Sequence, residues 1–117
     1  MPPMFENMIQ LIEKHASYGP AMKEAAEGGG REPLILDYHT HGRGSGYCVS
    51  IAKKKHNPLR ILGQAEPLQE LVHIRGVGED EAQCEDLMGA FGRELVQHYH
   101  LQAPPLIYLN GKPRPAP

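Results

Sequence analysis

Apolar residues recur at helical spacing near the start of the chain. One stripe collects Phe5, Met8, Ile9 and Ile12, while charged and amide side chains take most of the remaining positions. Pro20 suits the first turn of a second short helix, which ends before the glycines at 28–30. Three successive glycines indicate a flexible joint, so residues 1–30 are predicted to form a semi-detached helical arm.

Beyond these glycines the apolar positions alternate as they do in strands. The predicted strands are Leu34–His41, Tyr47–Lys53, Leu59–Leu62, Leu71–Arg75 and Leu106–Leu109. A long helix is predicted from about Glu79 to Tyr99. Its apolar stripe consists of Cys84, Leu87, Met88, Phe91, Leu95 and Tyr99.

Grouped strands followed by a helix predict an α+β fold. We expect a single, mostly antiparallel sheet of four to five strands with one long C-terminal helix packed on it and one or two short N-terminal helices. This domain spans residues 31–111, and residues 112–117 form a flexible, proline-rich tail. Leu36, Tyr38, Val49 and Ile51 are expected to meet the helix stripe.

Composition excludes several classes of protein. The chain has 117 residues, of which 40% are hydrophobic and 22% charged, so it fits one ordinary globular domain. It has no apolar run near the ~20 residues of a membrane span, and a net charge of −2 does not favour nucleic-acid binding. The two cysteines, Cys48 and Cys84, are too few for a disulfide framework, which predicts a cytoplasmic protein.

The register of the predicted hairpin decides which polar side chains meet. A four-residue loop, Gly42–Ser45, pairs the strands so that His39 lies opposite Cys48. Asp37 then lies opposite Ser50, and one face becomes wholly apolar. The other face collects Asp37, His39, His41, Cys48 and Ser50.

This polar face suits a zinc or other divalent transition-metal site. His39 and His41 are two residues apart and point the same way, and Cys48 or Asp37 would complete the ligand set. Two other interpretations are a thiol nucleophile paired with histidine and a polar face with local hydrogen bonds alone. His73 lies between Val72 and Ile74 and faces away from them, so it is a further candidate for this face.

The loop between the two strands suits a small anionic ligand. Glycines such as Gly44 allow close approach to the backbone, Ser45 adds a hydroxyl group, and Arg43 supplies a planar fork for phosphate or carboxylate. The alternative is a hairpin tip with one solvated arginine.

The segment His39-Thr40-His41 resembles the metal-binding segment of the JAMM/MPN metalloprotease family. That family places a serine and, three residues later, a ligand aspartate after its two histidines, followed by a helix. Here Ser50 is one position late, Ala52 or Lys53 replaces the aspartate, and a strand is predicted instead of the helix. We do not infer membership from this resemblance.

Two function classes follow from these residues. The first is a binding or assembly module that forms a homodimer through apolar residues of the N-terminal arm, such as Met4 and Phe5. The second is a metal-binding protein or metal-dependent enzyme that uses His39, His41 and Cys48, with Arg43 as the anion anchor.

Overall fold

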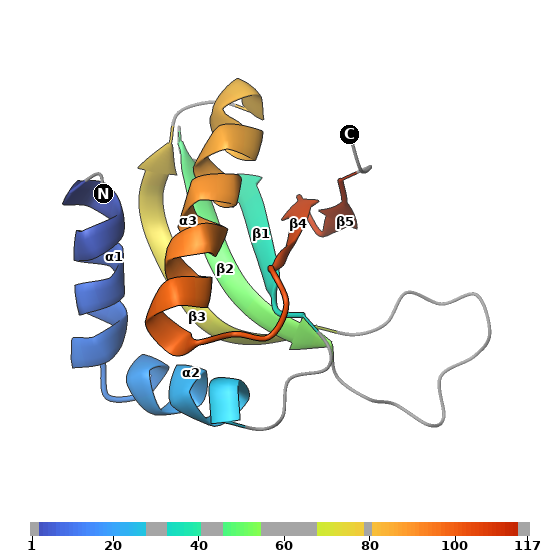
Figure 1. Ribbon diagram of the computed structural model, residues 1–117. Helices are drawn as coiled ribbons and strands as arrows, with labels where there is room; N and C mark the ends of the chain where they lie inside the picture. The colour runs from blue at the N-terminus through green and yellow to red at the C-terminus, as the bar shows by residue number, and fades with distance from the viewer. Residues whose placement is uncertain (1–2, 28–32, 41–45, 55–67, 79–80, 115–117) are drawn as a thin grey trace.

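The computed structural model describes residues 3–27, 33–40, 46–54, 68–78 and 81–114 (Figure 1). The elements are α1 (Pro3–Lys14), α2 (Tyr18–Glu27), β1 (Ile35–Thr40), β2 (Tyr47–Lys54), β3 (Leu68–Gly78), a 3₁₀ turn (Glu81–Gln83), α3 (Cys84–Tyr99), β4 (Leu106–Leu109) and β5 (Lys112–Pro113). The predicted α+β class is confirmed. The predicted strand Leu59–Leu62 lies outside the described residues.

The described strands form one mixed sheet in the order β3-β2-β1-β4-β5. Neighbours are antiparallel except β1 and β4, which are parallel. The expectation of a mostly antiparallel sheet is therefore wrong, and the physical reason is the connection through α3. A helix that crosses over the sheet returns the chain to the end where β3 began, so β4 runs in the same direction as β3 and β1. The long helix is also mid-chain rather than C-terminal, because β4 and β5 follow it.

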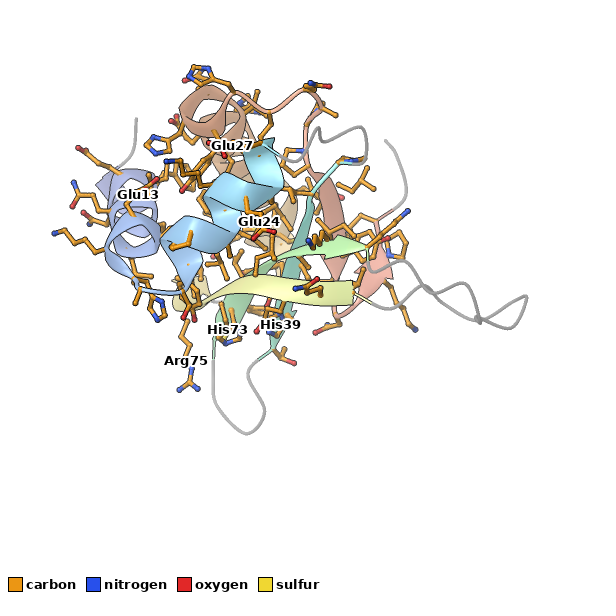
Figure 2. All side chains as sticks on the ribbon, turned by 90° about the horizontal axis from the view of Figure 1, so that it is seen from below. Glu13, Glu24, Glu27, His39, His73 and Arg75 are labelled. Carbon is orange, nitrogen blue, oxygen red and sulfur yellow. The ribbon has the colours of Figure 1, made fainter. Side chains whose placement is uncertain are left out.

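The helices α1, α2 and α3 lie on the same side of the sheet (Figures 1 and 2). α3 crosses the sheet face, and its predicted stripe is confirmed: Cys84, Met88, Phe91 and Leu95 are fully buried, with Leu87 and Tyr99 packed beside them. The sheet contributes Leu36, Tyr38, Val49, Ile51, Val72 and Ile74 to the same core. The α-helical part begins at Cys84, later than predicted, after the 3₁₀ turn.

The two N-terminal helices pack into this core rather than forming a semi-detached arm. Their apolar residues Phe5, Met8, Ile9, Ile12 and Met22 are buried in the core that the sheet and α3 share. The rings of Phe5 and Phe91 stack with centroids 5.9 Å apart. The helix α3 is too narrow to cover the sheet face alone, so the apolar stripe of α1 finds area to bury there.

The hairpin register and the last strand agree with their predictions. His39 pairs with Cys48 and Asp37 with Ser50, in the antiparallel ladder of β1 and β2. β4 has its predicted bounds, and Gly111, at φ 79°, turns the chain back into β5. The start of the predicted tail is therefore paired with β4. Among the described helices, none combines the length and the apolar character needed to cross a bilayer.

Candidate metal centre

The sheet face opposite the helices carries the polar residues of the hairpin. His39 and Cys48 are cross-strand neighbours on β1 and β2, and Ser50 is the neighbour of His73 on β3. His39, His73 and Arg75 project from this face in Figure 2, away from all three helices. The predicted separation of an apolar face from a polar one is therefore confirmed, and β3 extends the polar face by a third strand.

A β-bulge places Glu70 beside His73. Residues three apart on a regular strand point to opposite faces. Here the pairing shifts between Ile51 and Ala52, since Ile51 pairs with Val72 whereas Ala52 pairs with Glu70. The extra residue on β3 moves the Glu70 side chain to the polar face. Its carboxylate oxygen lies 3.4 Å from His73 Nδ1.

Three side chains from three strands converge on this face. One ligand atom each of His39, Cys48 and His73 lies within 4.8 Å of the other two. The two imidazole rings are 5.4 Å apart between centroids. Cys48 is only 1% exposed, whereas the side chains of His39 and His73 are 23% and 24% exposed. The sulfur therefore forms the floor of the cluster, and the two rings border solvent.

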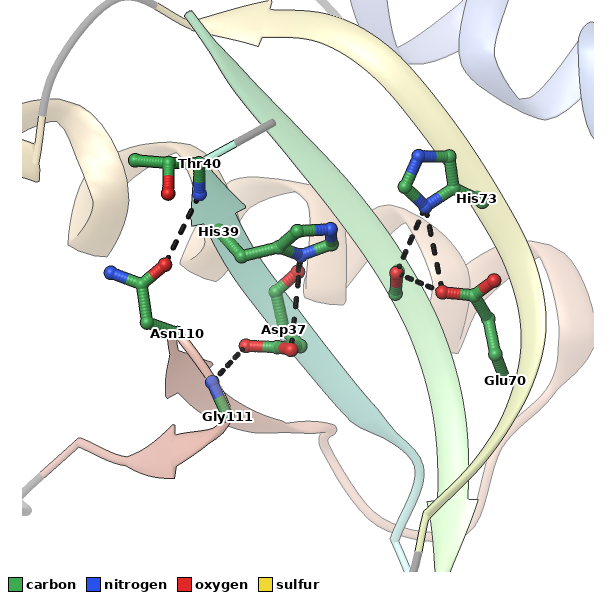
Figure 3. Close-up of polar contacts among 8 residues, drawn as sticks. Asp37, His39, Thr40, Glu70, His73, Asn110 and Gly111 are labelled. Carbon is green, nitrogen blue, oxygen red and sulfur yellow. Dashed lines mark hydrogen bonds and ion pairs between the residues drawn. The ribbon is translucent and has the colours of Figure 1, made fainter. Parts of the chain in front are cut away.

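Hydrogen bonds place both histidines in the same tautomer (Figure 3). The Nδ1 of His39 is 3.2 Å from the backbone carbonyl of Asp37, which can only accept, so the ring donates from Nδ1. The Ser50 hydroxyl donates its hydrogen to Glu70, so its oxygen is left to accept from His73 Nδ1 at 3.3 Å. In a neutral ring this places the lone pair on Nε2, the nitrogen that a metal ion would bind.

Asp37, predicted as a ligand, holds the β4–β5 turn. Its Oδ1 accepts the backbone N–H of Gly111 at 2.9 Å, and its Oδ2 lies 3.7 Å from His39 Nδ1. Nearby, the backbone N–H of Thr40 donates to the Asn110 side-chain carbonyl at 3.1 Å. Asp37 thus joins the turn to β1 and orients His39, and it is not in the converging cluster.

The remaining predicted site residues lie outside the described part of the chain. They are His41, Arg43, Gly44 and Ser45. The anion site at the loop and the role of His41 as a ligand stay predictions. Alternation along β3 already indicated that His73 faces outward, but nothing local to it indicated which strand it neighbours. The alternation pattern did not predict Glu70 on this face, because only the bulge brings it there.

A second polar cluster joins α1 to the end of α3, on the helical side of the molecule. His98 Nε2 lies 2.9 Å from Glu13 Oε1, and the Tyr99 hydroxyl donates to the same oxygen at 2.8 Å. Two hydrogen bonds lower the pKa of Glu13: the one with His98 has the larger effect, and the one from Tyr99 has the next largest. Burial, and then the Glu13 carboxylate, raise the pKa of Tyr99. This cluster ties the two helices together at one end.

The two cysteines occupy different environments. Cys84 is in the core at the start of α3, Cys48 is buried on the polar face, and neither forms a disulfide bond. Burial of Cys48 disfavours the thiol-nucleophile interpretation, because a substrate must reach the sulfur, whereas a metal ion needs only the gap between the three ligands. Comparison of the chain with protein-family models, with curated proteins and with solved structures found no match, so the chemistry of this site is inferred from its own geometry.

Proposed function

We propose that this protein binds a divalent transition-metal ion, with Zn²⁺ as the best fit, through His39, Cys48 and His73. The observation that carries the proposal is the convergence of their ligand atoms to within 4.8 Å. In a tetrahedral zinc site, bonds of ~2.0–2.1 Å to nitrogen and ~2.3 Å to sulfur place the ligand atoms about 3.3–3.6 Å apart. The side chains of His39 and His73 border solvent, so rotation of their rings would bring the ligand atoms to that spacing.

The donor set favours zinc and its neighbours over hard cations. One thiolate and two imidazoles suit Zn²⁺, Co²⁺ or copper, whereas Mg²⁺ and Ca²⁺ prefer oxygen ligands. The Glu70 carboxylate beside His73 and the Asp37 carbonyl beside His39 are the partners that orient metal-bound imidazoles and raise their basicity. Both rings thus have the support that a metal ligand needs.

Three ligands leave one position of a tetrahedral ion for water or another molecule. Closed structural zinc sites use four protein ligands, and sites that exchange a ligand use three. The described cluster supplies three and borders solvent at its two histidines. On the described residues, we therefore propose a metal-binding module with an exchangeable fourth ligand.

The alternative of a homodimeric assembly module has less support. It relied on apolar side chains of a free N-terminal arm, but Phe5 and Ile12 are buried within the chain's own core. Self-association is still a prediction, without a surface assigned to it.

Titration of the purified, metal-free full chain with Co²⁺ tests the proposal. A bound thiolate gives a near-ultraviolet charge-transfer band, and a tetrahedral site gives intense visible bands. We expect both, a dissociation constant of about 1 µM or tighter, roughly −8 kcal/mol, and displacement by Zn²⁺. Absence of binding at micromolar concentrations overturns the proposal.

Single variants identify the ligands. Cys48→Ser is expected to remove the charge-transfer band. Glu70→Gln removes only the hydrogen-bond partner of a ligand, so we expect it to weaken Co²⁺ binding by ~10–100-fold. His39→Ala and His73→Ala remove a ligand, so we expect them to weaken binding by more than that. Cys84→Ala and His98→Gln are matched controls that retain binding, and circular dichroism checks the fold of each variant. A His41→Ala variant distinguishes a ligand set that includes His41 from one that includes His73. If His41→Ala abolishes binding while His73→Ala does not, the assignment of His73 is wrong.

A further inference from the structure

A groove lies between α3 and the segment that leads into β4, on the helical side of the sheet and therefore apart from the histidine cluster. Its volume is about 430 Å³, within the range of small-molecule sites. The apolar lining consists of Met88, Val96, Pro104, Pro105 and Ile107. Its remaining lining residues are two glycines of α3, Arg93 and Gln97.

The two glycines of the groove differ in what surrounds them. A β-carbon on Gly92 would lie 3.5 Å from Pro105 and 3.6 Å from Leu36, so packing accounts for that glycine. Among the described residues, a β-carbon on Gly89 would meet only the Arg93 guanidinium, at 3.7 Å. Glycine in a helix interior is less stable than alanine, and no packed neighbour requires it at this position. The lack of a side chain at Gly89 lets the Arg93 guanidinium lie close to the helix backbone at the groove.

Arg93 gives the groove a single charge. It is exposed and extends over Gly89, and among the described residues of the lining it is the only charged one. No described carboxylate lies within ion-pair distance of it. A guanidinium group recognises a carboxylate with two parallel hydrogen bonds, and the side-chain amide of Gln97 offers a further donor.

From these observations we propose that the groove binds a small apolar carboxylic acid. The hydrocarbon part lies beside Gly89 against the prolines and Ile107, and the carboxylate pairs with Arg93. An apolar lining with one cation at its rim provides both parts of such an acid with a partner. This site is independent of the proposed metal site, since the two lie on opposite sides of the sheet.

Octanoate is the probe for this site, with octan-1-ol as the uncharged molecule of the same chain length. Ligand-observed NMR on the full chain is expected to show octanoate binding with a dissociation constant on the order of 1 mM or tighter. The methyl resonances of Val96 and Ile107 are expected to shift. Octanol is expected to bind at least tenfold more weakly. Absence of octanoate binding, or equal binding of the alcohol, overturns the proposal.

Two variants locate the site. Gly89→Leu fills the groove with a better helix former, so we expect it to abolish octanoate binding while the thermal midpoint stays the same or rises. Arg93→Gln is expected to weaken octanoate at least tenfold and to leave octanol unchanged. Arg75→Gln, an exposed arginine on the opposite face of the sheet, is the matched control and retains binding. A folded Gly89→Leu variant that binds octanoate as well as the parent contradicts the assignment.

Discussion

Truncation of Phe91 tests the core that α3 shares with α1 and the sheet. Phe91 is 0% exposed, and a buried phenylalanine removes ~150–250 Å² from water. At ~25 cal/mol per Å² this corresponds to ~4–6 kcal/mol, an upper estimate because alanine keeps the β-carbon and the unfolded chain buries part of the ring. We therefore expect Phe91→Ala to lower the free energy of unfolding by ~3–5 kcal/mol.

Urea denaturation followed by circular dichroism measures this change, since the chain has no tryptophan. With an m-value of ~2 kcal/mol per M, the urea midpoint is expected to fall by about 1.5–2.5 M. A loss below about 1 kcal/mol would refute the burial of Phe91, because surface substitutions rarely exceed that range.

A double-mutant cycle asks whether α1 is part of this core. Phe5→Leu and Phe91→Leu keep apolar side chains but remove the ring stacking, so the cycle is expected to give a coupling energy of ~0.5–1.5 kcal/mol. Phe5→Leu with Ile107→Val is the control, because β4 lies on the far side of α3 from α1 in Figure 1. Its coupling is expected to stay within ~0.3–0.5 kcal/mol of zero. A Phe5–Phe91 coupling of that small size would contradict the packing of Phe5 on Phe91.

Two further substitutions test the polar clusters. Hydrogen bonds lower the pKa of Glu13, so its carboxylate stabilises the folded chain above the unfolded pKa of ~4.3 and loses this effect as pH falls through the lower folded pKa. The difference in unfolding free energy between the parent chain and Glu13→Gln is therefore expected to be up to ~1 kcal/mol near neutral pH and to vanish in acid. A difference that stays constant from about pH 3 to 7 contradicts this reasoning. Asp37→Ala is expected to cost ~0.5–1.5 kcal/mol of unfolding free energy, because the exposed Gly111 N–H exchanges its carboxylate acceptor for water. It is also expected to reduce Co²⁺ affinity far less than Cys48→Ser, and equal losses would instead make Asp37 a ligand.

Short-range sequence patterns were enough to predict most of the helices and strands, and one pair of residues in the candidate site. Alternation along two strands joined by a short loop leaves one register that separates apolar from polar side chains, and this register sets His39 opposite Cys48. The stripe of α3 was predictable in the same way, because a helix places residues three and four apart on one side. Both features depend on neighbours in sequence.

Tertiary structure decided which strands lie side by side and which residues complete the site. The parallel pairing of β1 with β4 follows from the path of α3 over the sheet, a contact that no local pattern encodes. Likewise, His73 reaches the cluster because β3 pairs with β2, and Glu70 supports it because a bulge shifts the alternation of side chains along β3. The alternation of apolar and polar residues predicts which face of the sheet each side chain takes. Which strands lie side by side depends on the packing of the whole chain.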